Sequence, residues 1–236
     1  MDDEEYYMTE EQKVQMEIDR EKKRKKPPIW PVIVVVSIVV LIVLWRKYQD
    51  LTSQKKKPVV YLYPETTTEV AVQLEVDGKL TATYPKYQNG WKVTAEPDGT
   101  LKDANGKVYN YLYWEAEAQT RYDMSEGFCV KGSDTAEFLE KALAELGLTR
   151  REANEFIVYW LPLMEKNAYN VITFQGKAYT DSAVLTVDPK PDILIRVFMV
   201  WYGSRKPVTL KPQTLTAPER NGFTVVEWGG SKISHK

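Results

Sequence analysis

The chain contains very little histidine and cysteine, with one residue of each among 236. A disulfide needs two cysteines, so none can form within the chain. A Ser-His-Asp or Cys-His catalytic arrangement would depend on His235, which is the penultimate residue. A zinc site built from Cys and His ligands is excluded for the same reason. Any chemistry of the folded part must therefore come from carboxylates, hydroxyls or lysines.

The chain also lacks an excess of charge of either sign. Lys and Arg number 32 and Asp and Glu number 33, which gives a net charge of −1. A protein that binds nucleic acid needs a basic face to neutralise phosphates, so we expect no nucleic-acid partner. No Gly-rich phosphate loop is present, and the turns at Asp98 and Asp103 lack the acidic density of a calcium-binding loop. The sequence predicts no cofactor and no metal site.

One long apolar run is present, from Ile29 to Trp45 (IWPVIVVVSIVVLIVLW). As a helix it spans about 25 Å, and one more turn at either end reaches the ~30 Å of a bilayer core. Trp30 and Trp45 lie at its two ends, as aromatic residues at membrane interfaces do. No small-x-small cleavage site follows. The run predicts an uncleaved signal anchor in the lipid bilayer, with a buried core helix as the alternative.

Basic residues lie on both sides of this run, and the denser cluster precedes it. That cluster reads KKRKK and comprises Lys22, Lys23, Arg24, Lys25 and Lys26. The positive-inside rule favours a cytoplasmic N-terminus and an extracytoplasmic C-terminal domain in a single-pass protein of the cell membrane. The cluster is interpreted mainly as a determinant of this orientation. The alternative is contact with anionic lipid headgroups.

The sequence therefore predicts five parts. They are a charged cytoplasmic tail (1–28), the transmembrane anchor (29–45), a Lys-rich linker (46–57), an exported β-rich domain (58–230) and a disordered tail (231–236). In the exported domain, short β-type runs alternate with turn signals, which is typical of an antiparallel sandwich or barrel. The predicted fold class is α+β: one transmembrane helix, then a mainly antiparallel, sandwich-like β domain with an inserted α-helical hairpin.

We expect the helical hairpin at about 134–167. Capping-box patterns begin at Asp134 and at Thr149, and Gly147 separates the two helices. Pro162 should kink or end the second helix. Two strands stand out: 108–116, which carries several tyrosines, and 192–202, a nearly continuous apolar run that predicts a central strand.

Four stretches are recognisable together: KPVVYLYPE (57–65), YLYWEA (111–116), YWLPLMEKNAYNVITF (159–174) and GFTVVEWGG (222–230). They resemble a family of uncharacterised, membrane-anchored proteins found mainly in Gram-positive bacteria, whose exported part opens with K-P-V-I/V-Y-L-Y-P. The resemblance covers about 57–230. It implies a bacterial source and one integral domain that includes the hairpin, and it implies no catalytic or binding residues.

Three carboxylates are candidates for catalysis. Glu115 and Glu117 alternate on one strand, so they share a face about 6.5–7 Å apart, and Glu227 lies in the last predicted strand. Paired carboxylates beside aromatic residues are the minimum for glycoside hydrolysis. The alternative is structural, with Glu115 or Glu227 buried and paired with Arg121 or Arg196.

Aromatic residues supply the candidates for recognition. The segment Tyr84-Pro-Lys-Tyr-Gln-Asn-Gly-Trp91 mixes turn residues with Tyr84, Tyr87 and Trp91, and no periodicity buries all three rings. Tyr111 and Tyr113 share a strand face with Tyr109. That face is a stacking platform for sugars or peptides if it is solvated, and core if the hairpin covers it.

The remaining residue of interest is Cys129, which lies in an apolar context and is interpreted as a buried, inert thiol. The alternative is an exposed thiol that links two chains.

Together these features predict a non-catalytic, membrane-anchored binding or interaction module of the bacterial cell envelope, with an envelope protein or a glycan as its partner. Two alternatives remain: a carboxylate-dependent hydrolase that acts on cell-wall glycan through Glu115, Glu117 and Glu227, or a structural subunit of a membrane assembly.

Overall fold

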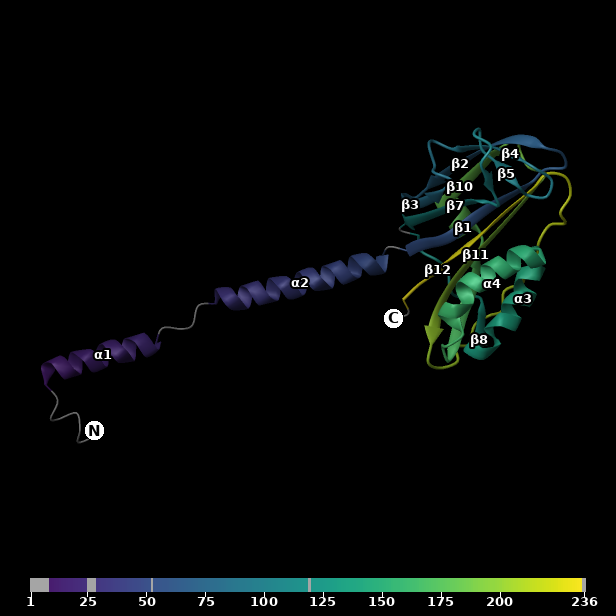
Figure 1. The fold of residues 1–236 in the computed structure, drawn as a ribbon. Coiled ribbons are helices and arrows are strands. Elements are labelled where there is room, and N and C mark those ends of the chain that lie inside the picture. The colour runs from purple at the N-terminus through teal and green to yellow at the C-terminus, as the bar shows by residue number, and fades with distance from the viewer. Residues whose placement is uncertain (1–8, 25–28, 52, 119, 235–236) are drawn as a thin grey trace. The chain divides into compact units, whose positions relative to one another are not determined.

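The computed structural model describes residues 9–24, 29–51, 53–118 and 120–234 (Figure 1). The chain divides into two compact units, Met1–Tyr48 and Gln49–Lys236. The first contains helix α1 (Glu10–Arg24) and most of helix α2 (Trp30–Leu51). Lys25 and Lys26 lie outside the described residues, so contact of the basic cluster with anionic lipid stays a prediction.

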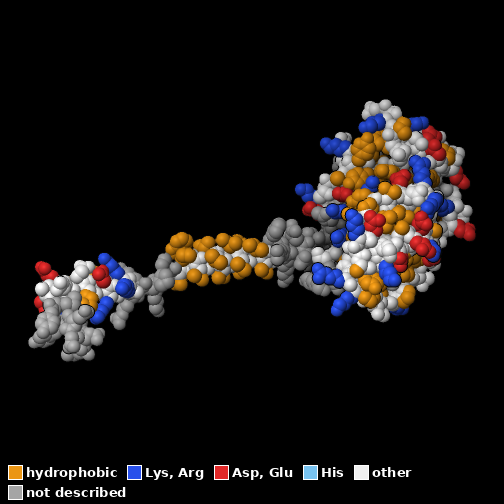
Figure 2. All heavy atoms as spheres, turned by 60° about the horizontal axis from the view of Figure 1, so that its bottom comes forward, with side chains coloured by type: hydrophobic (Ala, Val, Ile, Leu, Met, Phe, Trp, Pro, Cys, Tyr) orange, Lys and Arg blue, Asp and Glu red, His pale blue; other side chains and the backbone are white. Residues whose placement is uncertain are grey.

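The structure contradicts the predicted transmembrane helix. Among the described residues, no helix is both long and apolar enough to cross a membrane. Helix α2 has 22 residues, but it ends on the polar sequence RKYQDL, so its apolar part is shorter than the helix. That part spans about 25 Å, against ~30 Å for a bilayer core. Apolar side chains gather along its described part (Figure 2). The same finding contradicts the predicted location as a single-pass protein of the cell membrane.

The second unit is built on two sheets. One has seven strands in the order β3-β7-β1-β12-β11-β9-β8, and the other has five in the order β10-β2-β4-β5-β6. The described strand pairs are antiparallel except β11 with β12, which is parallel. The fold is therefore α+β with mostly antiparallel sheets. The strands of the large sheet are β1 (Ser53–Tyr63), β3 (Gly78–Tyr84), β7 (Leu112–Ala118), β8 (Phe128–Lys131), β9 (Tyr169–Gln175), β11 (Ile193–Ser204) and β12 (Thr224–Lys232). Those of the small sheet are β2 (Thr68–Val76), β4 (Trp91–Ala95), β5 (Leu101–Lys102), β6 (Val108–Tyr109) and β10 (Ala183–Asp188).

Three layers result, because the large sheet is covered on both faces (Figure 1). One face packs on the small sheet and the other on helices α3 (Thr135–Glu145) and α4 (Arg150–Met164). Successive residues of β12 alternate between the two cores: Val225 lies between the sheets and Val226 lies under the helices. Burial on both faces explains why the β11 sequence is a nearly continuous apolar run.

The helical hairpin is present within the predicted range. The capping box at its second helix is confirmed: the Thr149 side chain accepts a hydrogen bond from the Glu152 backbone N–H, and the Glu152 side chain accepts one from the Thr149 N–H at 2.7 Å. The capping box at the first helix is wrong, because Asp134 makes no side-chain capping bond. Helix α4 continues past Pro162 and ends two residues later at Met164.

Residues 205–222 make up most of the segment between β11 and β12, and we call them the strap. Side chains and a hydrogen bond from the Gly127 N–H to the Lys211 carbonyl hold the strap to the rest of the domain. The Gln213 side chain forms the two hydrogen bonds at the edge of β9 that a neighbouring strand would otherwise form. Its amide oxygen accepts from the Phe174 N–H at 2.8 Å, and its amide nitrogen donates to the Phe174 carbonyl at 3.0 Å. The Val208 N–H donates to the Sγ atom of Cys129 at 3.2 Å. Cys129 is half-buried rather than buried.

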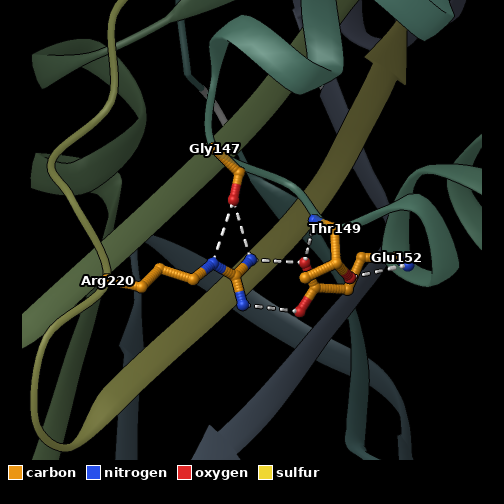
Figure 3. Close-up of polar contacts among 4 residues, drawn as sticks. All are labelled: Gly147, Thr149, Glu152 and Arg220. Carbon is orange, nitrogen blue, oxygen red and sulfur yellow. Dashed lines mark hydrogen bonds and ion pairs between the residues drawn. The ribbon is translucent and has the colours of Figure 1, made fainter.

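Arg220 fixes the end of the strap to the hairpin (Figure 3). Its guanidinium donates to both carboxylate oxygens of Glu152, which is 0% exposed. The same group donates twice to the Gly147 carbonyl, at 3.1 and 2.8 Å. Glu152 therefore serves the cap of α4 and the anchor of the strap at once.

Strand β12 continues through the pair Gly229-Gly230 and ends at Lys232, within the segment predicted as the tail (231–236). A Cβ atom on Gly230 would lie 2.6 Å from the Met199 carbonyl oxygen and 2.8 Å from the Trp160 ring. Glycine here permits close packing between β12, β11 and α4.

Candidate functional site

Glu227 is a buried ion-pair partner inside the sandwich. Its side chain is 0% exposed, and it accepts a hydrogen bond from Trp114 Nε1 at 3.1 Å. Its other oxygen accepts from Arg196 Nε at 2.6 Å. The structural alternative is thus confirmed for Glu227 and Arg196. A carboxylate enclosed in this way cannot reach a large substrate.

Tyr179 completes this buried group. The Arg196 guanidinium lies 4.7 Å from the centroid of the Tyr179 ring. Burial raises the pKa of Tyr179 well above its usual value, and the charge of Glu227 adds to this. Burial alone would lower the pKa of Arg196, but Glu227 and Tyr179 more than offset it, so the pKa is raised. Arg196 therefore stays charged at all ordinary pH values.

Glu115 and Glu117 lie on the opposite face of the same sheet. On β7, Trp114 and Ala116 enter the core between the sheets, so the residues that alternate with them point to the helical side. Glu115 accepts a long hydrogen bond (3.4 Å) from the Lys57 backbone N–H. The structure therefore does not bring the three candidate carboxylates together. Among the described residues, no group of three or more His, Cys, Asp or Glu is placed to hold a metal ion.

The tyrosines predicted on one strand are divided between the two sheets. Tyr109 belongs to β6 of the small sheet, Tyr111 lies in the bend that follows, and Tyr113 lies near the start of β7 in the large sheet. The chain bends at Asn110 and crosses from one sheet to the other, so the single strand 108–116 is wrong. Tyr111 and Tyr113 are half-buried against the core under the helices. Burial raises the pKa of Tyr113, and a hydrogen bond to Glu115 raises it further.

The segment 84–91 forms a loop at the edge of β2, and two of its predicted recognition residues fix its shape. The Tyr87 hydroxyl accepts from the Leu74 N–H at 3.0 Å and donates to the Leu74 carbonyl at 3.1 Å. The β2–β4 pairing ends at Val72, and the Tyr87 hydroxyl forms the hydrogen bonds of Leu74 that a longer β4 would have formed. Trp91 is 3% exposed and donates to the Pro85 carbonyl at 2.8 Å. Tyr84 is 52% exposed, so of these three rings it alone offers a large surface.

Two adjacent hollows lie on the outer face of the small sheet, and this loop lines one of them. Their volumes are about 420 and 460 Å³, and both are lined by Ala71, Lys92 and Val93. Val70, Val72 and Leu74 point into the core, so the alternating residues Glu69, Ala71 and Gln73 form the outer face of β2. We call the two hollows together the sheet groove. Each falls within the ~300–1,000 Å³ of small-molecule sites.

The turn after β5 forms the far rim of the groove, and Asp103 fixes it. The Asp103 carboxylate accepts from the backbone N–H groups of Asn105 (2.9 Å) and Lys107 (3.0 Å), and from the Tyr109 hydroxyl (3.0 Å). The bond from Lys107 is the main reason that the pKa of Asp103 is lowered. Tyr109 meets the exposed Tyr84 edge to face, with ring centroids 5.4 Å apart.

Sequence reasoning found the loop but missed the rest of the groove. Gln73 and Asn105 both line it, yet neither was a candidate. Gln73 alternates with core residues on β2, and Asn105 lies in a segment that was interpreted only as a turn. Polar residues on the solvent-exposed face of a sheet show no sequence pattern that sets them apart from other surface residues. That Gln73 and Asn105 lie in one hollow becomes visible only once the strands of the sheet are paired.

Comparisons of the chain with models of protein families, with curated proteins and with solved structures find no match. The resemblance to a membrane-anchored bacterial family therefore stays a prediction, and the function is argued from the geometry of the groove.

Proposed function

We propose that this protein is a non-catalytic binding module whose ligand lies in the sheet groove. The observation that carries the proposal is the hollowed outer face of the small sheet. Two contiguous hollows of about 420 and 460 Å³ lie on the sheet between the loop that Tyr87 holds and the turn that Asp103 holds. A preformed hollow of this kind lowers the entropy cost of binding.

The positions of the carboxylates favour binding over hydrolysis. A glycosidase needs two carboxyl groups on either side of one bond, about 5–10 Å apart. Glu227 is enclosed in an ion pair, and Glu115 and Glu117 lie on the other face of its sheet. In the groove, Asp103 already accepts three hydrogen bonds.

The groove can be blocked without disturbing the core. Ala71 lies at the junction of the two hollows, and its side chain points outward, so Ala71→Trp would fill them. Purified protein would be screened by thermal shift against a mixed library of saccharides, short peptides and small metabolites. A ligand that binds the native state stabilises it by RT ln(1 + [L]/Kd). We expect ligands that raise the melting temperature of the wild type and fail to raise that of Ala71→Trp.

The matched control is Val158→Trp, which adds the same ring at a position on α4 that is 75% exposed. This variant should respond to the same ligands as the wild type. Binding that survives in Ala71→Trp, or a library without any ligand, would contradict the proposal.

A further inference from the structure

Four side-chain amides without partners gather in the larger hollow. Gln73 comes from β2, Gln88 and Asn89 from the loop, and Asn105 from the turn after β5, and all four are exposed. No described residue forms a hydrogen bond with any of these four amides. By contrast, the amides of Gln175 and Gln213 are both occupied within the fold.

An amide presents both donors and acceptors, and so does a hydroxyl group. Four amides from three separate segments can therefore bind a ligand that carries hydroxyls at several points along its length. Asp103, the carboxylate in the same hollow, uses its oxygens to hold the turn. The amides are thus the groups best placed to bind directly.

The charges that line the groove balance. Three are positive, Lys86, Lys92 and Lys102, and three are negative, Glu69, Asp103 and Asp188. Lys102 is also paired with Glu96 at 3.1 Å. A site for a phosphate or a polyanion gathers cations, arginine above all, and no arginine lines either hollow. The balance favours a ligand without net charge.

An aromatic ring lies beside the amides. Tyr84 lies at the margin of the hollow: it is 52% exposed and meets Tyr109, which lines the hollow, edge to face. Lys107 Nζ lies 5.3 Å from the centroid of the Tyr84 ring, which leaves the other ring face for a ligand. A polar site beside an exposed, fixed ring suits a ligand that has hydroxyls on its edges and C–H groups on its faces.

We infer that the sheet groove binds a neutral oligosaccharide, through hydrogen bonds from Gln73, Gln88, Asn89 and Asn105 and through contact with the Tyr84 ring. This inference rests on the proposed function and names the class of its ligand.

The test is isothermal titration calorimetry of the full chain with cellohexaose, maltohexaose and chitohexaose as probes. At least one should bind, with an affinity that changes little between low and high salt because no charge is neutralised. Gln73→Ala and Asn105→Ala should each weaken binding about fivefold, since a net hydrogen bond is worth roughly 1 kcal/mol. Tyr84→Ala should weaken it by a similar factor.

The matched control is Asn154→Ala, which removes an exposed amide from α4 and should leave the affinity unchanged. If peptides or metabolites bind in a manner abolished by Ala71→Trp while no saccharide binds, the ligand class is wrong and the binding function stands. If no probe of any class binds, both proposals fail. Saccharide binding that the groove variants do not weaken would contradict the site, and a steep salt dependence would contradict a neutral ligand.

Discussion

Arg196 and Glu227 face each other across the parallel pair of β11 and β12, with Arg196 Nε 2.6 Å from Glu227 Oε2. The two side chains are 9% and 0% exposed, so the ion pair lies in the core between the sheets. Buried charges are costly unless they are paired, and each partner here depends on the other.

Replacing Arg196 alone should be severely destabilising. Arg196→Met leaves the Glu227 carboxylate buried with Trp114 as its remaining hydrogen-bond donor. We expect the free energy of unfolding to fall by about 3–5 kcal/mol, measured by urea denaturation. The double variant Arg196→Met/Glu227→Leu removes both charges and should recover most of this loss. The exposed Arg205→Met is the control, and equal losses in the single and double variants would contradict the argument.

Loss of Arg220 should release the strap. Arg220→Ala removes the bonds to Glu152 and Gly147 and should cost about 1.5–3 kcal/mol, as charged hydrogen bonds do. Thermolysin should then cut within 205–222 faster than in the wild type. Arg220→Lys should not restore resistance, because an ammonium group cannot bind two acceptors in this fork geometry. The exposed Lys206→Ala is the control, and wild-type cleavage rates in Arg220→Ala would refute the anchoring role.

Asp103 should make stability depend on pH in the acid range. Its pKa in the folded state lies below the ordinary value of 3.8, mainly because the Lys107 N–H donates to it. The stabilisation is therefore fully present above that ordinary value and is lost as the pH falls through the folded-state pKa. Asp103→Asn should lower the free energy of unfolding at neutral pH, with a smaller difference from wild type near pH 3. Glu219→Gln on the strap is the control for the loss of one charge, and a difference independent of pH would count against this role.

Gly230 should tolerate no side chain. In Gly230→Ala the new Cβ would lie 2.6 Å from a backbone oxygen and 2.8 Å from the Trp160 ring, and overpacking of this kind costs about 1–3 kcal/mol. Gly176→Ala is the matched control, because no atom lies within 4 Å of the added Cβ and φ is −96°. Thermal denaturation should separate the two variants clearly, and equal melting temperatures would show that the close packing is not limiting.

The sequence predicted the features that depend on local chemistry. The capping box of Thr149 and Glu152 follows from residues three positions apart, and the helical hairpin follows from the spacing of its apolar side chains. Neither depends on which segments pair later. Even here the rule has limits, since Asp134 matches the same pattern and forms no side-chain cap.

The features that depend on distant pairing could not be predicted. Tyr109 and Leu112 are three residues apart, yet they belong to different sheets, because the chain crosses between layers at Asn110 and Tyr111. Trp91 looked like an exposed ring in a turn-rich loop, but it is 3% exposed because β4 begins there and pairs with β2. The groove amides come from three segments that only the sheet brings together.

The contact between Gln213 and Phe174 bears on how the protein avoids aggregation. Strand β8 pairs with β9 only as far as Ile172, which would leave the last part of β9 as an unprotected strand edge. Such edges recruit strands from other chains. Because the Gln213 amide occupies both the N–H and the carbonyl of Phe174, that position cannot template a foreign strand. The strap thus covers this part of the sheet edge, and we expect that its release would expose β9 to pairing with strands of other chains.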